Sequence, residues 1–267
     1  MNLKGCCSLK FLPESVSNVK SLETLNISGC SKLEKLPERM GDIESLTELL
    51  ADGIENDQLL SSIGQLKHVR RLLLSGYRSA PPSSSLISAS VPNWKRWLPT
   101  PFIEWISVKF LKLSNGDLSD RATNCVDFSS LFSLEVLDLT GNKLSSMPSG
   151  IGSLPKLKYL SVQACKYLVS IPDLPPSLDF LGASRCKSLR RVRIPSERKK
   201  LLHIELGSSH LLEEIRGIEG QSNNFWSMYV IGLSYSPNKL QKSVVEVLFF
   251  SVALVQEETH TIGTYID

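Results

Sequence analysis

The chain has 267 residues, of which 42% are hydrophobic and 21% are charged, and its formal net charge is +3. This content supplies enough apolar side chains for a large core, and so small a net charge gives no indication of nucleic acid as a specific partner. The longest apolar run covers nine residues, 247–255, which is too short to span a bilayer.

The first clear element is the stretch "LETLNISGCSKLEKLP" at residues 22–37. Its apolar residues follow neither the spacing of a helix nor that of a plain strand. The same template occurs twice, 24 residues apart: Leu3, Cys6, Leu9, Leu12 and Pro13 correspond to Ile27, Cys30, Leu33, Leu36 and Pro37. This correspondence indicates a repeat protein.

Further copies follow along the chain, with periods of 21 to 26 residues outside one insertion. Their core positions are Leu46, Leu49 and Ala51; Val69, Leu72 and Leu74; Val108, Leu111 and Leu113; Leu137, Leu139 and Asn142; Leu160, Val162 and Cys165; Leu181, Ala183 and Cys186. About eight copies fit the leucine-rich repeat pattern L-x-x-L-x-L-x-x-N/C-x-L. We therefore expect an α/β fold, a leucine-rich repeat solenoid shaped as a curved horseshoe.

Each x-L-x-L segment predicts a short strand of a parallel sheet on the concave side. The Asn or Cys that follows enters a turn, where its side chain can bond to backbone groups of neighbouring coils. The convex side is expected to be irregular, 3-10 or briefly helical. Met1 lies directly before "NLKGCCSLKFLP", inside a coil, so we expect a fragment or a truncated gene product that starts within a solenoid.

The repeat is interrupted at residues 78–107, a stretch rich in Pro, Ser and Trp. One interpretation is a surface loop that elongates one coil and packs back onto the solenoid. The other is a binding loop, because Trp94, Trp97, Phe102 and Trp105 are large apolar anchors of the kind that dominate protein interfaces. Both interpretations stay open at this point.

After the last copies the pattern changes. We expect residues 1–200 to form the solenoid and residues 201–267 to form a partial post-repeat α/β tail. Ser236 and Pro237 suit the start of a helix in this tail. The preceding run "RCKSLRRVRIPSERKK" carries eight basic residues and one acidic residue, which is typical of a solvated face, with an anion-binding patch or a nuclear address as alternatives.

The six cysteines do not form metal-binding pairs, and Cys6, Cys30, Cys165 and Cys186 all fall at the turn position of the repeat. Their place in the repeat favours reduced, structural thiols and hence the cytoplasm or the nucleus. The N-terminus "MNLKGCCSLK" also lacks the pattern of a secretory signal.

Motifs of enzyme chemistry are missing from the sequence. The four histidines are far apart and outside metal-binding spacings, and neither a phosphate loop nor a nucleophile elbow occurs. We expect no catalytic residue, no bound metal and no cofactor. The function is then expected to lie in a protein-binding surface on the concave strands. Its candidate residues are Thr24, Asn26, Ser28, Glu48, Asp52, Arg71, Ser75, Lys112, Ser114, Asp138, Thr140, Tyr159, Ser161, Gln163, Phe180 and Ser184.

Several phrases resemble one family. "SIPDLPPSLDFLGASRCKSLRRV" is similar to the last repeats of plant intracellular immune receptors of the TIR-NB-LRR class, and "LNISGCSKLEKLPERMGDIESLTELLADG" to their middle repeats. "LEEIRGIEGQSNNFW" and "SPNKLQKSVVE" look like the segment after the repeats. The resemblance covers residues 1 to about 248.

This resemblance implies a disease resistance protein of plant innate immunity. It further implies that the repeats recognise a pathogen effector or a guarded host protein, and that they restrain a nucleotide-driven switch by contact with the receptor's own nucleotide-binding domain. The TIR domain with its NAD-cleaving activity and the phosphate loop are absent from this sequence, so no enzyme activity carries over. The alternative is a stand-alone scaffold or decoy that binds a host protein. A cell-surface ectodomain is disfavoured by the missing signal and the reduced cysteines.

Overall fold

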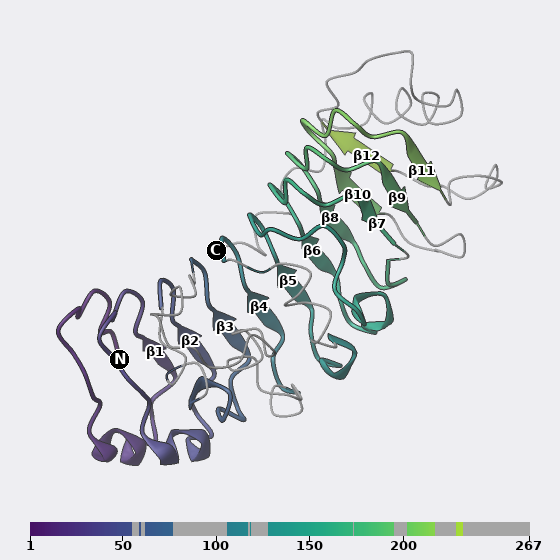
Figure 1. The fold of residues 1–267 in the computed structure, drawn as a ribbon. Helices are drawn as coiled ribbons and strands as arrows, with labels where there is room; N and C mark the ends of the chain where they lie inside the picture. The colour runs from purple at the N-terminus through teal and green to yellow at the C-terminus, as the bar shows by residue number, and fades with distance from the viewer. Residues whose placement is uncertain are drawn as a thin grey trace, which may run out of the picture.

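The computed structural model describes residues 1–54, 59, 62–76, 106–116, 118, 128–172, 174–194, 202–216 and 228–231. They form an elongated stack of coils, with residues 1–54 at one end and residues 202–216 and 228–231 at the other (Figure 1). The predicted solenoid is confirmed. Among the described residues, no helix combines the length and the apolar character that crossing a lipid bilayer requires.

The main sheet gives the stack its order. It contains nine short parallel strands in the described residues, each paired with the strand of the next coil. They are β1 (Thr24–Asn26), β2 (Glu48–Leu50), β3 (Arg71–Leu73), β4 (Phe110–Lys112), β5 (Val136–Asp138), β6 (Tyr159–Ser161), β8 (Phe180–Gly182), β10 (Leu202–Glu205) and β12 (Met228–Ile231). Asn2 adds the first coil through a parallel bridge to Asn26.

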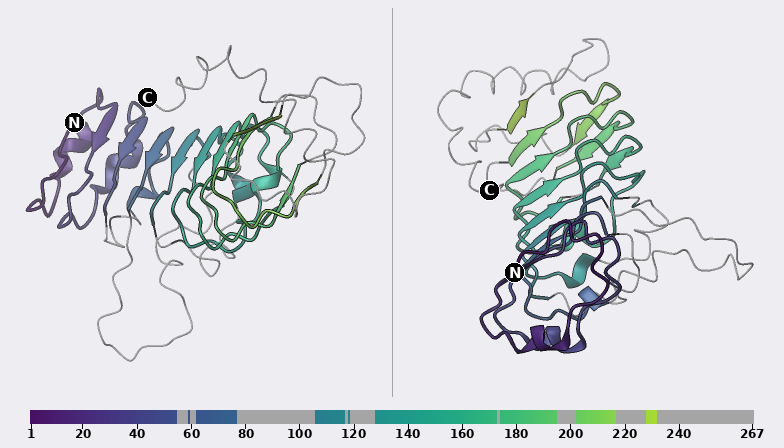
Figure 2. Two further views of the ribbon diagram at one scale, coloured as in Figure 1. Left: turned by 90° about the horizontal axis from the view of Figure 1, so that it is seen from above. Right: turned by 90° about the vertical axis from the view of Figure 1, so that its left-hand side faces the viewer.

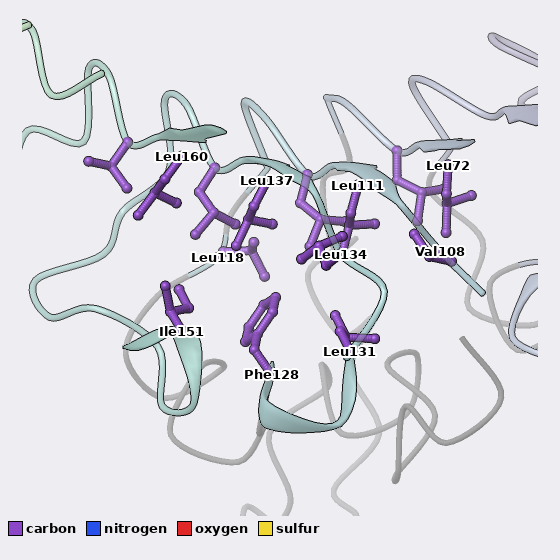
Figure 3. Close-up of a cluster of buried hydrophobic side chains, with 14 of the residues drawn as sticks. Leu72, Val108, Leu111, Leu118, Phe128, Leu131, Leu134, Leu137, Ile151 and Leu160 are labelled. Carbon is purple, nitrogen blue, oxygen red and sulfur yellow. The ribbon is translucent and has the colours of Figure 1, made fainter. Parts of the chain in front are cut away.

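The middle leucine or isoleucine of the strands from β1 to β6, of β8 and of β10 points into the core, as the repeat pattern predicts. These residues are at most 1% exposed: Leu25, Leu49, Leu72, Leu111, Leu137, Leu160, Leu181 and Ile204. Figure 3 shows four of these leucines as a row under the sheet, with the ring of Phe128 rising toward them from the opposite side. A continuous apolar core thus runs through the stack and ties each coil to its neighbours.

The side opposite the main sheet carries short 3-10 helices in several coils (Figure 2). They are η1 (Glu14–Asn18), η2 (Glu38–Asp42), η5 (Phe128–Ser130) and η6 (Ile151–Ser153). Pro13 and Pro37 stand directly before the first two, with φ near the value that the proline ring imposes. The prediction of 3-10 structure on this side is confirmed for these coils.

The late coils differ, because they add a second sheet that the sequence analysis did not expect. It consists of three parallel strands in the described residues, β7 (Ser170–Ile171), β9 (Arg191–Arg193) and β11 (Glu214–Arg216). Buried β-branched residues alternate there with polar ones: Ile171, Val192 and Ile215 are at most 4% exposed. This alternation with period two favours strands over helical turns.

The main sheet continues past residue 200, where the sequence analysis expected the repeats to end. His203 pairs with Phe180 and Ile204 with Leu181, so β10 extends the register of β8. The signal was hidden because Ser209 occupies the position of the usual Asn or Cys. The division into a solenoid at 1–200 and a tail at 201–267 otherwise stays a prediction. Residues 78–105 of the predicted insertion at 78–107 and the helix expected from Ser236 lie outside the described residues.

The coils are joined by polar side chains at the turn position, which we call the turn ladder: Cys30, Asn142, Cys165, Cys186 and Ser209. Each donates to a backbone carbonyl of the preceding coil, as the repeat pattern predicts. The donor to acceptor distances are 3.1 Å from Cys30 to Leu3, 2.7 Å from Asn142 to Leu113, 3.3 Å from Cys165 to Leu139, 3.1 Å from Cys186 to Val162, and 3.0 Å from Ser209 to Ala183.

Serines reinforce the other end of the strands. The hydroxyl of Ser45 donates to the carbonyl of Leu22 at 2.9 Å, and that of Ser177 donates to the carbonyl of Leu157 at 2.9 Å. Each bond again reaches back by one coil. Buried carbonyls that the strand ladder leaves without a partner would be costly, so these side chains stabilise the stacked state specifically.

The turns after the Asn2 bridge and after strands β1 to β6, β8 and β10 have a left-handed backbone. Five turns place glycine there, including Gly53 at φ +71° and Gly141 at φ +74°. Asn115, Ala164, Arg185 and Ser208 adopt the same conformation with φ between +55° and +62°. A side chain makes this conformation unfavourable by about 1–2 kcal/mol, so the late turns store strain that the surrounding hydrogen bonds hold in place.

The glycine turns allow a direct test. A Cβ built on Gly53 would meet nothing within 4 Å, so Gly53→Ala probes backbone conformation alone. We expect it to lower the free energy of unfolding by about 1 kcal/mol, and Ala164→Gly to raise it by a few tenths. Urea denaturation followed by circular dichroism measures both changes. A Gly53→Ala variant as stable as the parent chain would contradict the assignment.

The buried thiols of the turn ladder are expected to resist alkylation. Burial raises the pKa of Cys165 to about 11 and that of Cys186 to about 12, so little nucleophilic thiolate forms at neutral pH. Iodoacetamide should modify the exposed Cys6 and Cys7 in the native chain and reach Cys165 and Cys186 only in urea. Mass spectrometry of the peptides gives the site-specific rates, and equal rates at Cys6 and Cys186 would refute the expectation.

Candidate protein-binding face

The register of the main sheet arranges its outward side chains in three rows. Row A contains the first residue of each strand triplet: Thr24, Glu48, Arg71, Phe110, Val136, Tyr159, Phe180 and His203. Row B contains the third: Asn26, Leu50, Leu73, Lys112, Asp138, Ser161, Gly182 and Glu205. Row C precedes the turns: Ser28, Asp52, Ser75, Ser114, Thr140, Gln163 and Ser184.

The structure places all sixteen predicted residues of the concave face in these rows. Most are partly exposed, but Ser28, Ser114, Ser161 and Phe180 are buried, at 8%, 2%, 4% and 9% exposure. These four therefore support their neighbours more than they offer contact area. That the face binds a protein stays a prediction.

The early part of row A is charged. Glu48 accepts a hydrogen bond from the hydroxyl of Thr24 at 3.1 Å and pairs with the Arg71 Nε at 3.0 Å. The guanidinium of Arg71 in turn lies over the ring of Phe110, with its Cζ 4.1 Å from the ring centroid. A partly exposed pair and cation–π contact of this kind contribute about 0.5–1 kcal/mol each.

Row C is held by hydrogen bonds between coils. The carboxylate of Asp52 accepts from the backbone N–H of Ser75 at 2.6 Å, and the hydroxyls of Ser75 and Ser114 are 2.9 Å apart. The hydroxyls of Thr140 and Ser161 are 2.8 Å apart. These bonds fix the orientation of the row, so the face is organised before any partner arrives.

The late part of row A is aromatic. The rings of Tyr159 and Phe180 stack with centroids 4.6 Å apart and an angle of 2° between their planes. The ring of His203 continues the stack at 5.3 Å from Phe180, at 11°. We call these three residues the aromatic ladder. Both distances are close to the spacing of adjacent strands, about 4.8 Å, so the sheet itself sets the stack.

Row B makes room for this ladder. A Cβ on Gly182 would lie 3.0 Å from the amide nitrogen of Gln163 and 3.1 Å from a ring carbon of Phe180. The same amide nitrogen donates to the carboxylate of Glu205 at 3.1 Å. Because Gly182 has no side chain, Gln163 can reach across row B and bond to the carboxylate of Glu205 beside the aromatic ladder.

The ladder lies in a negative environment. Burial raises the pKa of Tyr159, the charges of Asp138 and Glu205 raise it further, and a hydrogen bond with Ser161 acts in the opposite direction. Burial also lowers the pKa of His203, partly offset by Glu205, whose oxygen is 4.0 Å from the imidazole Nε2. His203 is therefore neutral at pH 7.

Sequence reasoning missed Phe110, Val136, His203 and Glu205. The first two are apolar and were not included among the candidate residues of the concave face, although their place directly before Leu111 and Leu137 marks them as row A. The last two belong to the coil whose turn residue is Ser209. The signal available for them was the phrase "HIEL", which keeps the apolar spacing of a repeat strand.

The predicted anchors of the insertion, Trp94, Trp97 and Trp105, lie outside the described residues. Whether they contact the solenoid or a partner stays a prediction. The row residues Arg71 and Phe110 flank this insertion in sequence and pair in the sheet, so the insertion interrupts the sequence and leaves the register intact.

Comparison with known families supports the fold. Residues 21–43 and 133–154 match the family model described as Leucine Rich Repeat. The leucine-rich repeat domain of the type III effector XopL aligns with 82% of this chain and 72% of its own, with a TM-score of 0.56 and 19% identity. The chain has the leucine-rich repeat fold. Its fold is that of a repeat scaffold, not of a catalytic domain.

The chain is also similar to plant disease resistance proteins of the TIR-NB-LRR class. It is 32% identical to disease resistance-like protein DSC1 and 31% identical to disease resistance protein RPS4B, both of Arabidopsis thaliana, over 73% and 74% of its length. It is 31% identical to TMV resistance protein N of Nicotiana glutinosa over 40% of its length. The aligned parts span only 15%, 17% and 9% of these relatives.

His203 provides a test of the ladder. Its lowered pKa means that the unfolded chain, with an ordinary value of 6.5, binds a proton more readily than the native state. Its contribution to stability is therefore fully present above pH 6.5 and decreases as the pH falls from 6.5 toward the lowered value.

We expect the stability lost between about pH 7.5 and about pH 5.5 to be smaller in His203→Phe, which keeps a stacking ring that does not titrate. Urea unfolding of both chains at the two pH values measures the difference. An identical loss in both would show that His203 is not desolvated in the native ladder.

Proposed function

We propose that this chain is the sensor region of a plant intracellular immune receptor and that it binds a protein through rows A, B and C. The observation that carries the proposal is the similarity to plant disease resistance proteins over about three quarters of the chain. The prearranged rows of polar, charged and aromatic side chains support it as well, since they provide a ready surface for a partner.

The physical argument concerns the cost of binding. Ordering a surface at the moment of association consumes about 0.5–1.5 kcal/mol per mobile side chain. Hydrogen bonds between coils already fix Asp52, Ser75 and Thr140, and stacking fixes Phe180. Contacts made by such a face retain most of their free energy, and many weak contacts along a curved sheet add into one specific interface.

The expected partner is a pathogen effector or a guarded host protein, recognised in the cytoplasm or the nucleus. In a complete receptor the same repeats would also contact the receptor's own nucleotide-binding domain and restrain its activation. A bound effector would then compete with that restraining contact, because one face cannot serve two partners at once. Such a switch requires the effector to bind the receptor's released state more tightly than its restrained state.

A stand-alone scaffold or decoy that binds a host protein is the second candidate. It is favoured by the same rows and needs no attached switch. Sequencing the transcript upstream of the codon for Met1 separates the two. An in-frame phosphate loop and TIR domain would support the receptor, whereas a stop codon together with detectable protein of this length would support the scaffold.

The binding surface can be tested by paired variants. A library of effectors from plant pathogens, together with host proteins, is screened for binding to the chain. The double variant Arg71→Ser/Tyr159→Ser alters row A in both its charged and its aromatic part. We expect it to weaken every specific partner by at least about tenfold, because anchors of these two types dominate interfaces.

The matched control is Lys166→Ser/Lys187→Ser, which alters two exposed residues beyond the rows. It should bind as the parent chain does, and circular dichroism should show both variants folded. Partners that lose affinity only in the control variant would place the interface elsewhere on the solenoid.

A further inference from the structure

The further inference rests on the proposed function and concerns one ring of the aromatic ladder. Phe180 covers one face of Tyr159, with nearly parallel ring planes. The other face of Tyr159 is directed along row A toward Val136, its register partner on β5. A valine side chain ends at its γ carbons, so it cannot cover a phenol ring out to the hydroxyl. Tyr159 accordingly keeps partial exposure, while Val136 beneath is 8% exposed.

A carboxylate stands beside this uncovered face. Asp138 is two residues after Val136 on the same strand and the same side of the sheet, about 7 Å away along the strand. One of its oxygens accepts from the backbone N–H of Thr140 at 2.9 Å, which orients the group. Glu205 adds a second negative charge on the far side of the ladder, and both charges act on the phenol of Tyr159.

These charges lack a cation within the described part of the chain. No described lysine or arginine forms an ion pair with Asp138 or Glu205. Lys112 is the register partner of Asp138 on β4, yet the two do not come within 4.0 Å. The late face therefore offers negative charge and an aromatic surface to whatever binds it.

The early half of row A shows what fits such a surface. There the guanidinium of Arg71 lies 4.1 Å over the ring of Phe110 and pairs with Glu48 at 3.0 Å. The late half has the ring and the carboxylate in the same sheet, and no arginine in the neighbouring coil, because that coil has Val136. The stack of planar groups along row A is interrupted at this one position.

We propose that the late face binds an arginine of an extended segment in the partner protein, with its guanidinium over Val136, against the uncovered face of Tyr159 and paired with Asp138. Arginine fits better than lysine because its planar group stacks on a ring and meets a carboxylate with two parallel hydrogen bonds. A neutral sugar would use the ring and leave the two carboxylates without a counter-charge.

Peptides make the proposal testable on the whole chain. The probe is a short acetylated and amidated peptide with two arginines among glycine and serine residues, and its control has citrulline in place of arginine. Citrulline has nearly the same shape and no charge. Titrations followed by calorimetry or by NMR should show binding of the arginine peptide and at least about tenfold weaker binding of the control.

Variants that are expected to change the affinity for the arginine peptide in opposite directions locate the site. Asp138→Asn and Tyr159→Leu should each weaken the arginine peptide by about 3- to 10-fold. Lys112→Gln should strengthen it by removing a nearby positive charge. Glu44→Gln, an exposed carboxylate outside the rows, should leave the affinity unchanged and controls for net charge.

Equal affinity for the citrulline peptide, or an Asp138→Asn variant that binds like the parent, would overturn the proposal. So would binding of a neutral oligosaccharide such as cellohexaose without binding of the arginine peptide. A screened partner that responds to Arg71→Ser/Tyr159→Ser but not to Asp138→Asn would leave the proposed function standing and remove the arginine contact. Binding of the arginine peptide, with no protein partner found in the screen, would leave the arginine contact standing and remove the proposed function.

Discussion

Each coil of this protein depends on the coil before it for hydrogen bonds that it cannot make alone. The donors of the turn ladder reach back to carbonyls of the preceding coil, and Ser45 and Ser177 do the same at the other end of the strands. The middle leucines likewise pack against apolar side chains of adjacent coils in one continuous core. Because backbone groups and side chains are satisfied together, stacking is the condition for every strand, and the rows on the outer face follow from it.

The sequence allowed the repeat, the buried middle residues and the turn donors to be predicted, because each of these positions tolerates few residue types. Cys186 is a clear case, since a small donor is needed there and the surrounding leucines show the phase. Ser209 makes the same bond but is too common in sequences to be recognised, so the coil with β10 was missed. The second sheet was missed for another reason: alternation over two or three residues, as around Val192, is too short to stand out from chance.

The candidate face was predictable at the level of strand positions and not at the level of contacts. Tyr159 and Phe180 are equivalent residues of adjacent coils, so their proximity could be predicted. Their nearly parallel stack also depends on Gly182, because the missing side chain leaves space for Gln163 and for the ring of Phe180. Arg71 and Phe110 are far apart in sequence because of the insertion, so their contact emerges only once the register is known. Row A is thus charged at its early end and aromatic at its late end.

The second sheet affects how the late coils can bend. A solenoid curves when its two walls have unequal spacing from coil to coil, as when strands on one wall face bulkier turns on the other. Where β7, β9 and β11 stand across the core from strands of the main sheet, both walls repeat at about the 4.8 Å distance of paired strands. Such a segment has no geometric reason to close into an arc. The aromatic ladder therefore lies where strands form both walls of the solenoid, whereas the charged early rows lie where 3-10 helices stand opposite the main sheet.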